Sequence, residues 1–274
     1  MFDTHAHLNF TSFEDILEQT IQKAKKAGVQ QIVVPGSNIE NSKRAVNIAQ
    51  NFEGIYAAVG IHPFHVYGHF IYDKNLEPDF AELESLLQED KVVAVGETGL
   101  DRHSYKSKKY PDYQVSNELI DLQKKVFIRQ INLAIKYNKG LIIHQRNVGE
   151  ELLKTLEENW LEELAGRCVF HFCEPDQGML NFAIKNKVYI GVDGDVTYNL
   201  VKQEFVKQIP LGLLVLETDS PYVSPEPIKS EGEKINQPAN LKLIAGEVAE
   251  ILGIEQEKVE KVTTENAKNL FLKT

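Results

Sequence analysis

The sequence predicts an α/β fold, a closed (β/α)8 barrel that forms a single domain over residues 1–274 with one extra helix at its C-terminal end. Short apolar, β-branched runs alternate along the chain with amphipathic stretches of helical period. The apolar runs are nearly continuous, which is typical of parallel strands covered by helices. An open doubly wound sheet is the alternative. Such a sheet usually carries a glycine-rich phosphate loop after its first strand, where this sequence has His-x-His.

Eight strands and nine helices are expected in alternation. The strands are Phe2–Leu8, Gln31–Gly36, Tyr56–Ile61, Val92–Gly96, Gly140–His144, Cys168–Phe172, Val188–Val192 and Leu213–Glu217. The helices are Phe13–Lys26, Ile39–Asn51, Phe80–Gln88, Asn117–Tyr137, Gly149–Leu164, Gln177–Lys185, Leu200–Gln208, Leu241–Leu252 and Lys258–Phe271. Three stretches look irregular, and since each follows a strand we expect them on the active-site rim: Pro63–Pro78, Arg102–Tyr113 and Ser224–Gln237.

Composition and charge narrow the functional class. The net charge of −10 argues against tight, sequence-independent binding to a long phosphate backbone, although divalent cations in a site can supply positive charge locally. Cys168 and Cys173 are expected in one apolar run with side chains on opposite faces, so we predict reduced thiols. The N-terminal residues do not resemble a signal peptide, and no apolar run is long enough to span a membrane. We therefore expect a cytoplasmic protein.

His5 and His7 lie near the end of the first expected strand. Side chains two residues apart on a strand point to the same side, so both imidazoles can reach one metal ion. Asp3 lies on the same face. The pair alone fits solvated surface histidines equally well, so the other strand ends decide between the two interpretations.

Metal-ligating residue types recur at those other ends. Glu97, His144, His171 and Asp219 each lie at or next to the C-terminal end of a different expected strand. Catalytic groups of barrels are found at that end, and a buried imidazole or carboxylate is costly unless it is paired or binds a metal. Together with His5 and His7 these residues suit zinc, manganese or magnesium.

Each of these residues also has a simpler explanation. His171 could be a core histidine, and Asp219 could be an ordinary turn residue. Glu97 could pair with Arg146 or Arg102. Each explanation accounts for one residue, whereas a metal site accounts for all of them.

A series of motifs in a fixed order carries a family resemblance over nearly the whole chain. The motifs are Asp3-Thr4-His5-Ala6-His7-Leu8, Gly60-Ile61-His62-Pro63, Val95-Gly96-Glu97-Thr98-Gly99-Leu100-Asp101, Ile143-His144-Gln145-Arg146, Phe170-His171, Leu216-Glu217-Thr218-Asp219-Ser220-Pro221 and Thr264-Glu265-Asn266-Ala267-Lys268-Asn269-Leu270-Phe271. In this order they resemble the TatD family of metal-dependent deoxyribonucleases, within the wider amidohydrolase-like barrels. The sequence departs from the family pattern after His171, where Phe172-Cys173-Glu174-Pro175 stands in place of a stretch ending in Phe-Ser-Gly.

The resemblance implies two divalent metal ions (Mg, Mn or Zn) and a role for each proposed ligand. His5, His7, Glu97 and Asp219 would hold one cation. Glu97, His144 and His171 would hold the second, so that Glu97 bridges the two. The departing loop after His171 lies over the substrate in this family, which leaves substrate preference open.

A mechanism follows as a hypothesis. The metals lower the pKa of a bound water to about 7, and Asp219 takes its proton. The planar fork of Arg146 suits a phosphate clamp, although a salt bridge to a rim carboxylate is equally compatible with its position. His62 is expected to contact the substrate. The basic run Arg102–Lys109, with its tyrosines, could follow a nucleic-acid strand or form a solvated loop.

Three functions remain open at this point. The first is a metal-dependent hydrolase that acts as a deoxyribonuclease or phosphodiesterase on DNA ends or single strands. The alternative is a metal-dependent ester or amide hydrolase, such as a deacylase of charged tRNA or a small-molecule amidase, because one metal site can attack carbonyl and phosphoryl centres alike. A non-catalytic binding module is the third. We expect a monomer or weak oligomer, with no membrane partner.

Overall fold

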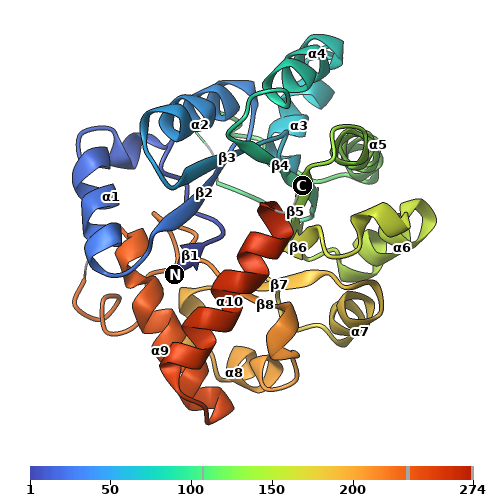
Figure 1. Cartoon of the computed structure of the whole chain (residues 1–274). Coiled ribbons are helices and arrows are strands. Elements are labelled where there is room, and N and C mark those ends of the chain that lie inside the picture. Colours follow the sequence, from blue (N-terminus) through green and yellow to red (C-terminus); the bar gives the residue numbers. More distant parts are fainter. Residues whose placement is uncertain (107, 233–234, 273–274) are drawn as a thin grey trace.

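The computed structural model describes residues 1–106, 108–232 and 235–272. In this part of the chain eight parallel strands form one sheet, in the order β1 to β8, with helices outside it (Figure 1). The strands are β1 Phe2–Asp3, β2 Gln31–Pro35, β3 Ile55–Val59, β4 Val92–Asp101, β5 Gly140–Arg146, β6 Cys168–Phe170, β7 Tyr189–Val192 and β8 Leu214–Leu216. This is the (β/α)8 barrel that the alternating pattern predicts.

The helices between and after the strands begin at identifiable caps. Ser116 accepts a hydrogen bond from the Leu119 N–H at the start of α5, and Asp176 accepts one from the Met179 N–H at the start of α7. The helices are α1 Leu17–Lys26, α2 Ile39–Asn51, α3 Pro63–Ile71, α4 Glu77–Leu86, α5 Asn117–Lys136, α6 Gly149–Asn159, α7 Gln177–Asn186, α8 Leu200–Val206, α9 Leu241–Leu252 and α10 Gln256–Phe271.

The barrel closes where the segments after β8 and β1 meet. The Asp219 N–H donates to the His5 carbonyl at 2.9 Å, and the His7 N–H donates to the Ser220 carbonyl at 2.7 Å. These bonds place segments that are far apart in the sequence side by side at the carboxyl end of the strands. Three of the predicted ligand residues, His5, His7 and Asp219, therefore lie on two backbone segments that hydrogen-bond to each other.

The opposite end of the barrel is covered by α10. Figure 1 shows this helix lying across the strands at the amino-terminal end of the barrel. Its Leu270 and Phe271 pack among inward side chains that include Phe2 and Val33. Burying each large apolar side chain stabilises the fold by about 1.5–3 kcal/mol. The extra C-terminal helix thus seals one end and leaves the carboxyl end as the site of polar chemistry.

Two of the expected strands differ strongly in length from the observed ones, and the ends of the others differ by at most two residues. The strand predicted over Phe2–Leu8 is only Phe2–Asp3, because the backbone at His5–His7 bonds to the segment after β8. The strand predicted over Val92–Gly96 continues to Asp101, because it pairs again with β5 after a register shift. Glu97 therefore lies inside a strand rather than after one.

The prediction that Pro63–Pro78 is irregular is wrong. Most of that stretch forms α3 and the start of α4. Pro63 occupies the first turn of α3, and His62 caps the helix by accepting a hydrogen bond from the Phe64 N–H. Proline is pre-organised for that position, so the local signal for a helix was present in the sequence.

The other two rim stretches do lack helices and strands where they are described. Ser107, within Arg102–Tyr113, and residues 233–234, within Ser224–Gln237, lie outside the described residues. Cys168 and Cys173 are buried free cysteines, as predicted, but Cys173 does not lie on the expected strand because β6 ends at Phe170. Among the helices that the structure describes, none combines the length and the apolar character that a membrane span needs.

Candidate metal centre

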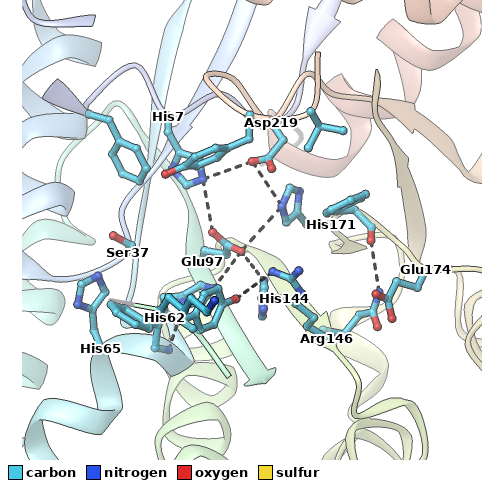
Figure 2. Close-up of a pocket in the computed structure, with 18 of the residues that line it drawn as sticks. His7, Ser37, His62, His65, Glu97, His144, Arg146, His171, Glu174 and Asp219 are labelled. Atoms are coloured by element: carbon cyan, nitrogen blue, oxygen red, sulfur yellow. Dashed lines mark hydrogen bonds and ion pairs between the residues drawn. The ribbon is translucent and has the colours of Figure 1, made fainter. Parts of the chain in front are cut away.

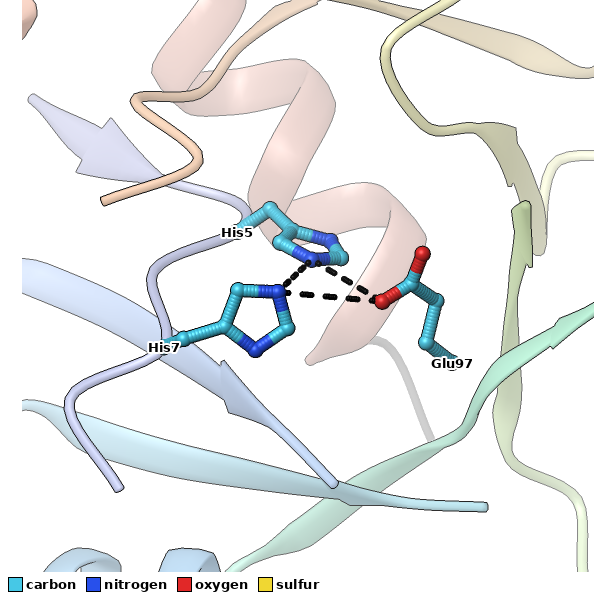
Figure 3. A group of neighbouring side chains, drawn as sticks. All are labelled: His5, His7 and Glu97. Carbon is cyan, nitrogen blue, oxygen red and sulfur yellow. Dashed lines mark hydrogen bonds and ion pairs between the residues drawn. The ribbon is translucent and has the colours of Figure 1, made fainter. Parts of the chain in front are cut away.

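Two imidazoles from the segment after β1 meet at the carboxyl end of the barrel. His5 is fully buried, His7 is nearly so, and their Nε2 atoms lie 3.2 Å apart (Figure 3). Their Nδ1 atoms are buried and have no hydrogen-bond partner among the described residues. Two imidazole nitrogens that face each other at this distance need a proton or a cation between them. The pair is therefore not a solvated surface feature.

Glu97 presents one carboxylate oxygen to this pair. Its Oε2 lies 3.5 Å from His5 Nε2 and 3.7 Å from His7 Nε2. The preceding Gly96 has φ +154°, and a Cβ there would lie 2.7 Å from the Cβ of Ile142. Only glycine permits this close approach of β4 to β5. The approach brings the Glu97 side chain, on β4, into the centre.

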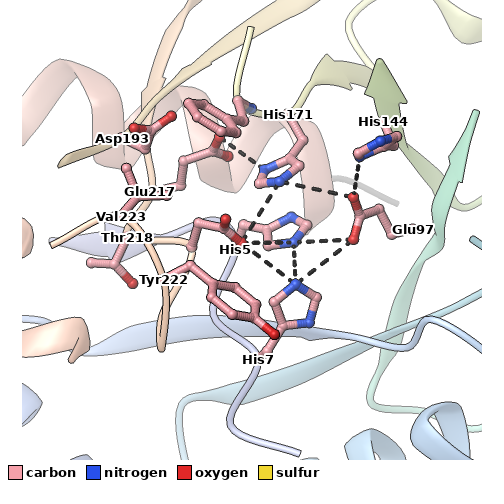
Figure 4. Close-up of polar contacts among 12 residues, drawn as sticks. His5, His7, Glu97, His144, His171, Asp193, Glu217, Thr218, Tyr222 and Val223 are labelled. Atoms are coloured by element: carbon pink, nitrogen blue, oxygen red, sulfur yellow. Dashed lines mark hydrogen bonds and ion pairs between the residues drawn. The ribbon is translucent and has the colours of Figure 1, made fainter. Parts of the chain in front are cut away.

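The other oxygen of the same carboxylate faces a second group of imidazoles. Glu97 Oε1 lies 2.8 Å from His144 Nδ1, 3.5 Å from His62 Nε2 and 3.9 Å from His171 Nε2. Figure 4 shows Glu97 between His144 and His171 on one side and His5 and His7 on the other. Among the described residues, no lysine or arginine forms an ion pair with Glu97.

Asp219 completes the first group from the loop after β8. Its Oδ1 lies 3.5 Å from His7 Nε2 and 3.8 Å from both His5 Nε2 and His171 Nε2. Its φ is +50°, a conformation that Asp tolerates better than most residues. Phe172 and Val223, which line the same cavity, also have positive φ. Strained backbone of this kind is typical of functional sites.

Glu217 is a site residue that the sequence analysis missed. It is fully buried, its Oε1 lies 2.9 Å from His171 Nδ1, and it accepts a hydrogen bond from the Phe172 N–H at 2.6 Å. Gly191 makes room for it, because a Cβ there would lie 2.5 Å from the carboxyl group. Glu217 and Asp219 are two residues apart at a strand end, a spacing that could have revealed both.

Asp101 is the second missed residue. Its Oδ2 lies 3.0 Å from His144 Nε2 and accepts a hydrogen bond from the Tyr105 hydroxyl at 2.6 Å. Because the predicted strand ended at Gly96, Asp101 was not recognised as part of the strand that carries Glu97. Asp101 and Glu217 thus play similar parts. Each contacts the ring nitrogen of His144 or His171 that does not face Glu97.

Burial and the surrounding charges set the protonation of the centre. Burial raises the pKa of Glu97, but the imidazoles around it outweigh burial and hold that pKa well below its usual range. Burial lowers the pKa of His171 and of His144, yet the adjacent carboxylates outweigh it and raise these values to about 10 and about 9. At His62 burial prevails and lowers the pKa to about 3.

The centre opens into a cavity of about 800 Å³ at the carboxyl end of the barrel (Figure 2). Arg146 lines it, 5.5 Å from the centroid of the Tyr105 ring, and among the ion pairs of the described residues none involves Arg146. Lys106 and Lys108 from the basic run also line it, whereas Arg102 pairs with Glu151 on the outside. The aromatic side chains of the wall include Phe10, Phe64, Tyr105 and Tyr222.

The predicted residues therefore converge. His5, His7, Glu97, His144, His171 and Asp219 lie in one cluster, and His62 and Arg146 line the cavity beside it. The simpler explanations do not describe this geometry, because Glu97 contacts imidazoles rather than Arg146 or Arg102.

The donor set fits a divalent cation. Two ligand atoms bound at 2.0–2.1 Å in tetrahedral geometry lie roughly 3.3 Å apart. The separations of 3.2 Å between the Nε2 atoms of His5 and His7, and of 3.5 Å from His5 Nε2 to Glu97 Oε2, are close to that value. Imidazole and carboxylate ligands suit zinc and manganese, and carboxylates also suit magnesium.

Comparison with known proteins agrees with this geometry. The family model described as TatD related DNase matches residues 2–272. A Bacillus subtilis (strain 168) protein described as an uncharacterized metal-dependent hydrolase, YabD, is 36% identical over a match that covers 99% of this chain and 98% of the relative's chain. A Klebsiella pneumoniae (strain 342) protein described as the 3'-5' ssDNA/RNA exonuclease TatD is 28% identical over 99% and 97%.

A solved structure agrees over the same length. The Escherichia coli K12 protein YJJV, described as a TatD homolog, superposes with a TM-score of 0.84 at 26% identity, covering 100% of this chain and 98% of its own. Sequence and fold both match over nearly the full length of each protein. The chain therefore belongs to the TatD family of metal-dependent hydrolases.

Proposed function

We propose that this enzyme hydrolyses phosphodiester bonds in nucleic acid, with DNA ends or single strands as its substrate. The observation that carries the proposal is the position of Glu97. Its Oε2 faces the imidazoles of His5 and His7 and its Oε1 faces that of His144, which is an arrangement that suits two cations sharing one bridging ligand. Paired cations are suited to phosphoryl transfer, because they stabilise charge on both the attacking and the leaving oxygen.

The proposed ligands divide between the two oxygens. His5, His7 and Asp219 would join Glu97 at the first cation, and His144 and His171 would join it at the second. Magnesium, manganese or zinc bound by these residues would lower the pKa of the attacking water and neutralise charge on the phosphate. Glu217 orients the imidazole of His171 by contacting its Nδ1, and Asp101 orients that of His144 by contacting its Nε2.

Asp219 is the proposed proton acceptor. It lies at the junction of the centre and the cavity and is 7% exposed, so a water molecule in the cavity can reach its carboxylate. The three imidazoles around its Oδ1 outweigh the effect of burial and keep the pKa of Asp219 low. It is therefore ionised and able to accept a proton from the attacking water.

Arg146 and the aromatic wall support a nucleic-acid substrate. Arg146 offers a planar fork to the cavity with no carboxylate partner among the described residues, which suits a bidentate phosphate contact. Phe10 and Tyr222 on one wall, and Phe64 and Tyr105 on another, offer faces on which bases can stack. The name of the Klebsiella pneumoniae relative agrees with single-stranded DNA or RNA.

A substrate panel tests the proposal. The metal-loaded enzyme is given end-labelled single-stranded DNA, bis-p-nitrophenyl phosphate, and aminoacyl and amide substrates, and its metal content is determined by elemental analysis. We expect cleavage of the two phosphodiesters, loss of that cleavage in Asp219→Asn, and retention in Glu157→Gln, a control at an exposed carboxylate on α6. Turnover of the esters or amides without phosphodiester cleavage would establish the alternative hydrolase function instead.

A further inference from the structure

His62 has a fixed tautomer because it caps α3. Its Nδ1 accepts a hydrogen bond from the Phe64 N–H at 3.0 Å, and the intervening Pro63 has no N–H to offer. A ring nitrogen that accepts a hydrogen bond carries no proton, so this imidazole is neutral and carries its single N–H on Nε2. The opposite tautomer would direct two N–H groups at each other and leave a helix N–H without an acceptor.

The Nε2–H group lies at the catalytic cavity, beside Glu97. His62 lines that cavity, its Nε2 lies 3.5 Å from Glu97 Oε1, and its side chain is 12% exposed. The rings of His62 and His144 also pack in a T-shaped arrangement, with centroids 4.2 Å apart. The helix cap and the contact with His144 thus fix the ring, and its Nε2–H lies beside Glu97 Oε1.

We propose that His62 is a further catalytic residue, a neutral hydrogen-bond donor that contacts an anionic oxygen of the scissile phosphate through Nε2–H. This inference rests on the proposed phosphodiesterase function. The group stabilises negative charge without giving up its proton, in the manner of an oxyanion-hole donor. It also follows that His62 is not a metal ligand, even though its ligand atoms lie close to those of Asp101 and His144, because a coordinating nitrogen must carry no proton.

Two substitutions separate the donor from the helix cap. In His62→Asn the side-chain oxygen replaces Nδ1 as the acceptor, since Asn is a preferred N-cap residue, but nothing reaches the position of Nε2. In His62→Gln the longer amide restores an N–H at that position and provides a poor cap. We expect His62→Asn to keep its melting temperature and metal content while kcat falls about 100-fold. His62→Gln should recover a large part of that loss despite a lower melting temperature.

Two readouts are independent of turnover. Nitrogen-15 NMR of imidazole-labelled protein, with the His62 signal assigned by its loss in His62→Asn, should show a bare Nδ1 and a protonated Nε2. Inorganic phosphate should bind the metal-loaded His62→Asn variant about tenfold more weakly than the wild type. If the wild type cleaves no phosphodiester, the proposed function fails, while the NMR and phosphate results still judge the role of His62.

Three results would overturn the inference. A His62→Asn variant with wild-type kcat and phosphate affinity would leave His62 only its cap role. Loss of bound metal in that variant, with unchanged folding, would make His62 a ligand. A protonated Nδ1 in the NMR spectrum would remove the donor from the cavity.

Discussion

Two clusters of buried charge lie at the carboxyl end of this barrel, and they are built in opposite ways. One consists of Lys202 on α8 with Asp193 and Asp195 after β7. The Lys202 side chain is 1% exposed, and its ammonium lies 3.7 Å and 3.5 Å from the two carboxylates and donates to the Cys173 carbonyl at 2.7 Å. This cluster contains its own cation.

The second cluster surrounds Glu97 and Asp219. Its carboxylates are about as deeply buried, but the described residues that face them are imidazoles rather than ammonium or guanidinium groups. It also opens into the cavity, whereas Lys202 does not line that cavity. Buried carboxylates are stable only when their charge is compensated. The difference indicates that the first cluster holds the fold together and that the second is arranged for a cation from solution.

The largest expected effect is on the second cluster. Glu97→Gln removes the charge shared by both groups of imidazoles, so phosphodiester hydrolysis should fall by at least about 1000-fold, equivalent to about 4 kcal/mol in the activation barrier. Single-turnover cleavage rates and elemental analysis measure the two consequences together. Full metal content with near wild-type cleavage would show that Glu97 is not a shared ligand, and Glu157→Gln controls for the loss of a carboxylate.

The first cluster should respond through stability. Lys202→Met leaves the buried carboxylate of Asp193 and the partly buried one of Asp195 without a cation, so the free energy of unfolding should fall by about 3–5 kcal/mol in urea titrations. Adding Asp193→Asn and Asp195→Asn to the same chain removes both charges and should recover most of the loss. If the single variant is as stable as the wild type, Lys202 does not compensate these carboxylates and the comparison fails.

Removal of metal distinguishes the clusters without a mutation. If the free cation concentration is about 100 times the dissociation constant of the second cluster, chelation should lower the free energy of unfolding by about 2.7 kcal/mol. The loss would be seen as a lower melting temperature. The Glu97→Gln variant should show a much smaller shift, whereas the Lys202→Met variant, starting from a lower stability, should show the wild-type shift. An equal response to chelation in wild type and Glu97→Gln would show that the metal binds elsewhere.

The contrast between the clusters also marks what the sequence could predict. Residue type and position near strand ends identified His5, His7 and Asp219, because the barrel topology brings such positions together, although His5 and His7 lie after β1 rather than on it. Lys202 could not be identified, because its partners come from two loops and a helical pattern does not show where an ammonium is buried. The fold was predictable from alternation, whereas helix α3 and the true end of β4 depended on a cap and a register shift.

Asp101 tests whether the groups behind the imidazoles matter, and it should have the smallest effect. The Asp101 carboxylate holds His144 Nε2 while Nδ1 of the same ring faces Glu97, so Asp101→Asn should loosen that ring. Loss of such a partner typically costs about 10–100-fold in metal affinity or activity. Tyr105→Phe is the comparison variant, because it keeps the Asp101 carboxylate and removes the hydroxyl that donates to Asp101 and accepts from Arg146. Metal titrations and cleavage rates should rank wild type first, Tyr105→Phe second and Asp101→Asn third. An Asp101→Asn variant with wild-type metal affinity and cleavage rate would show that Asp101 does not contribute to the function of the second cluster.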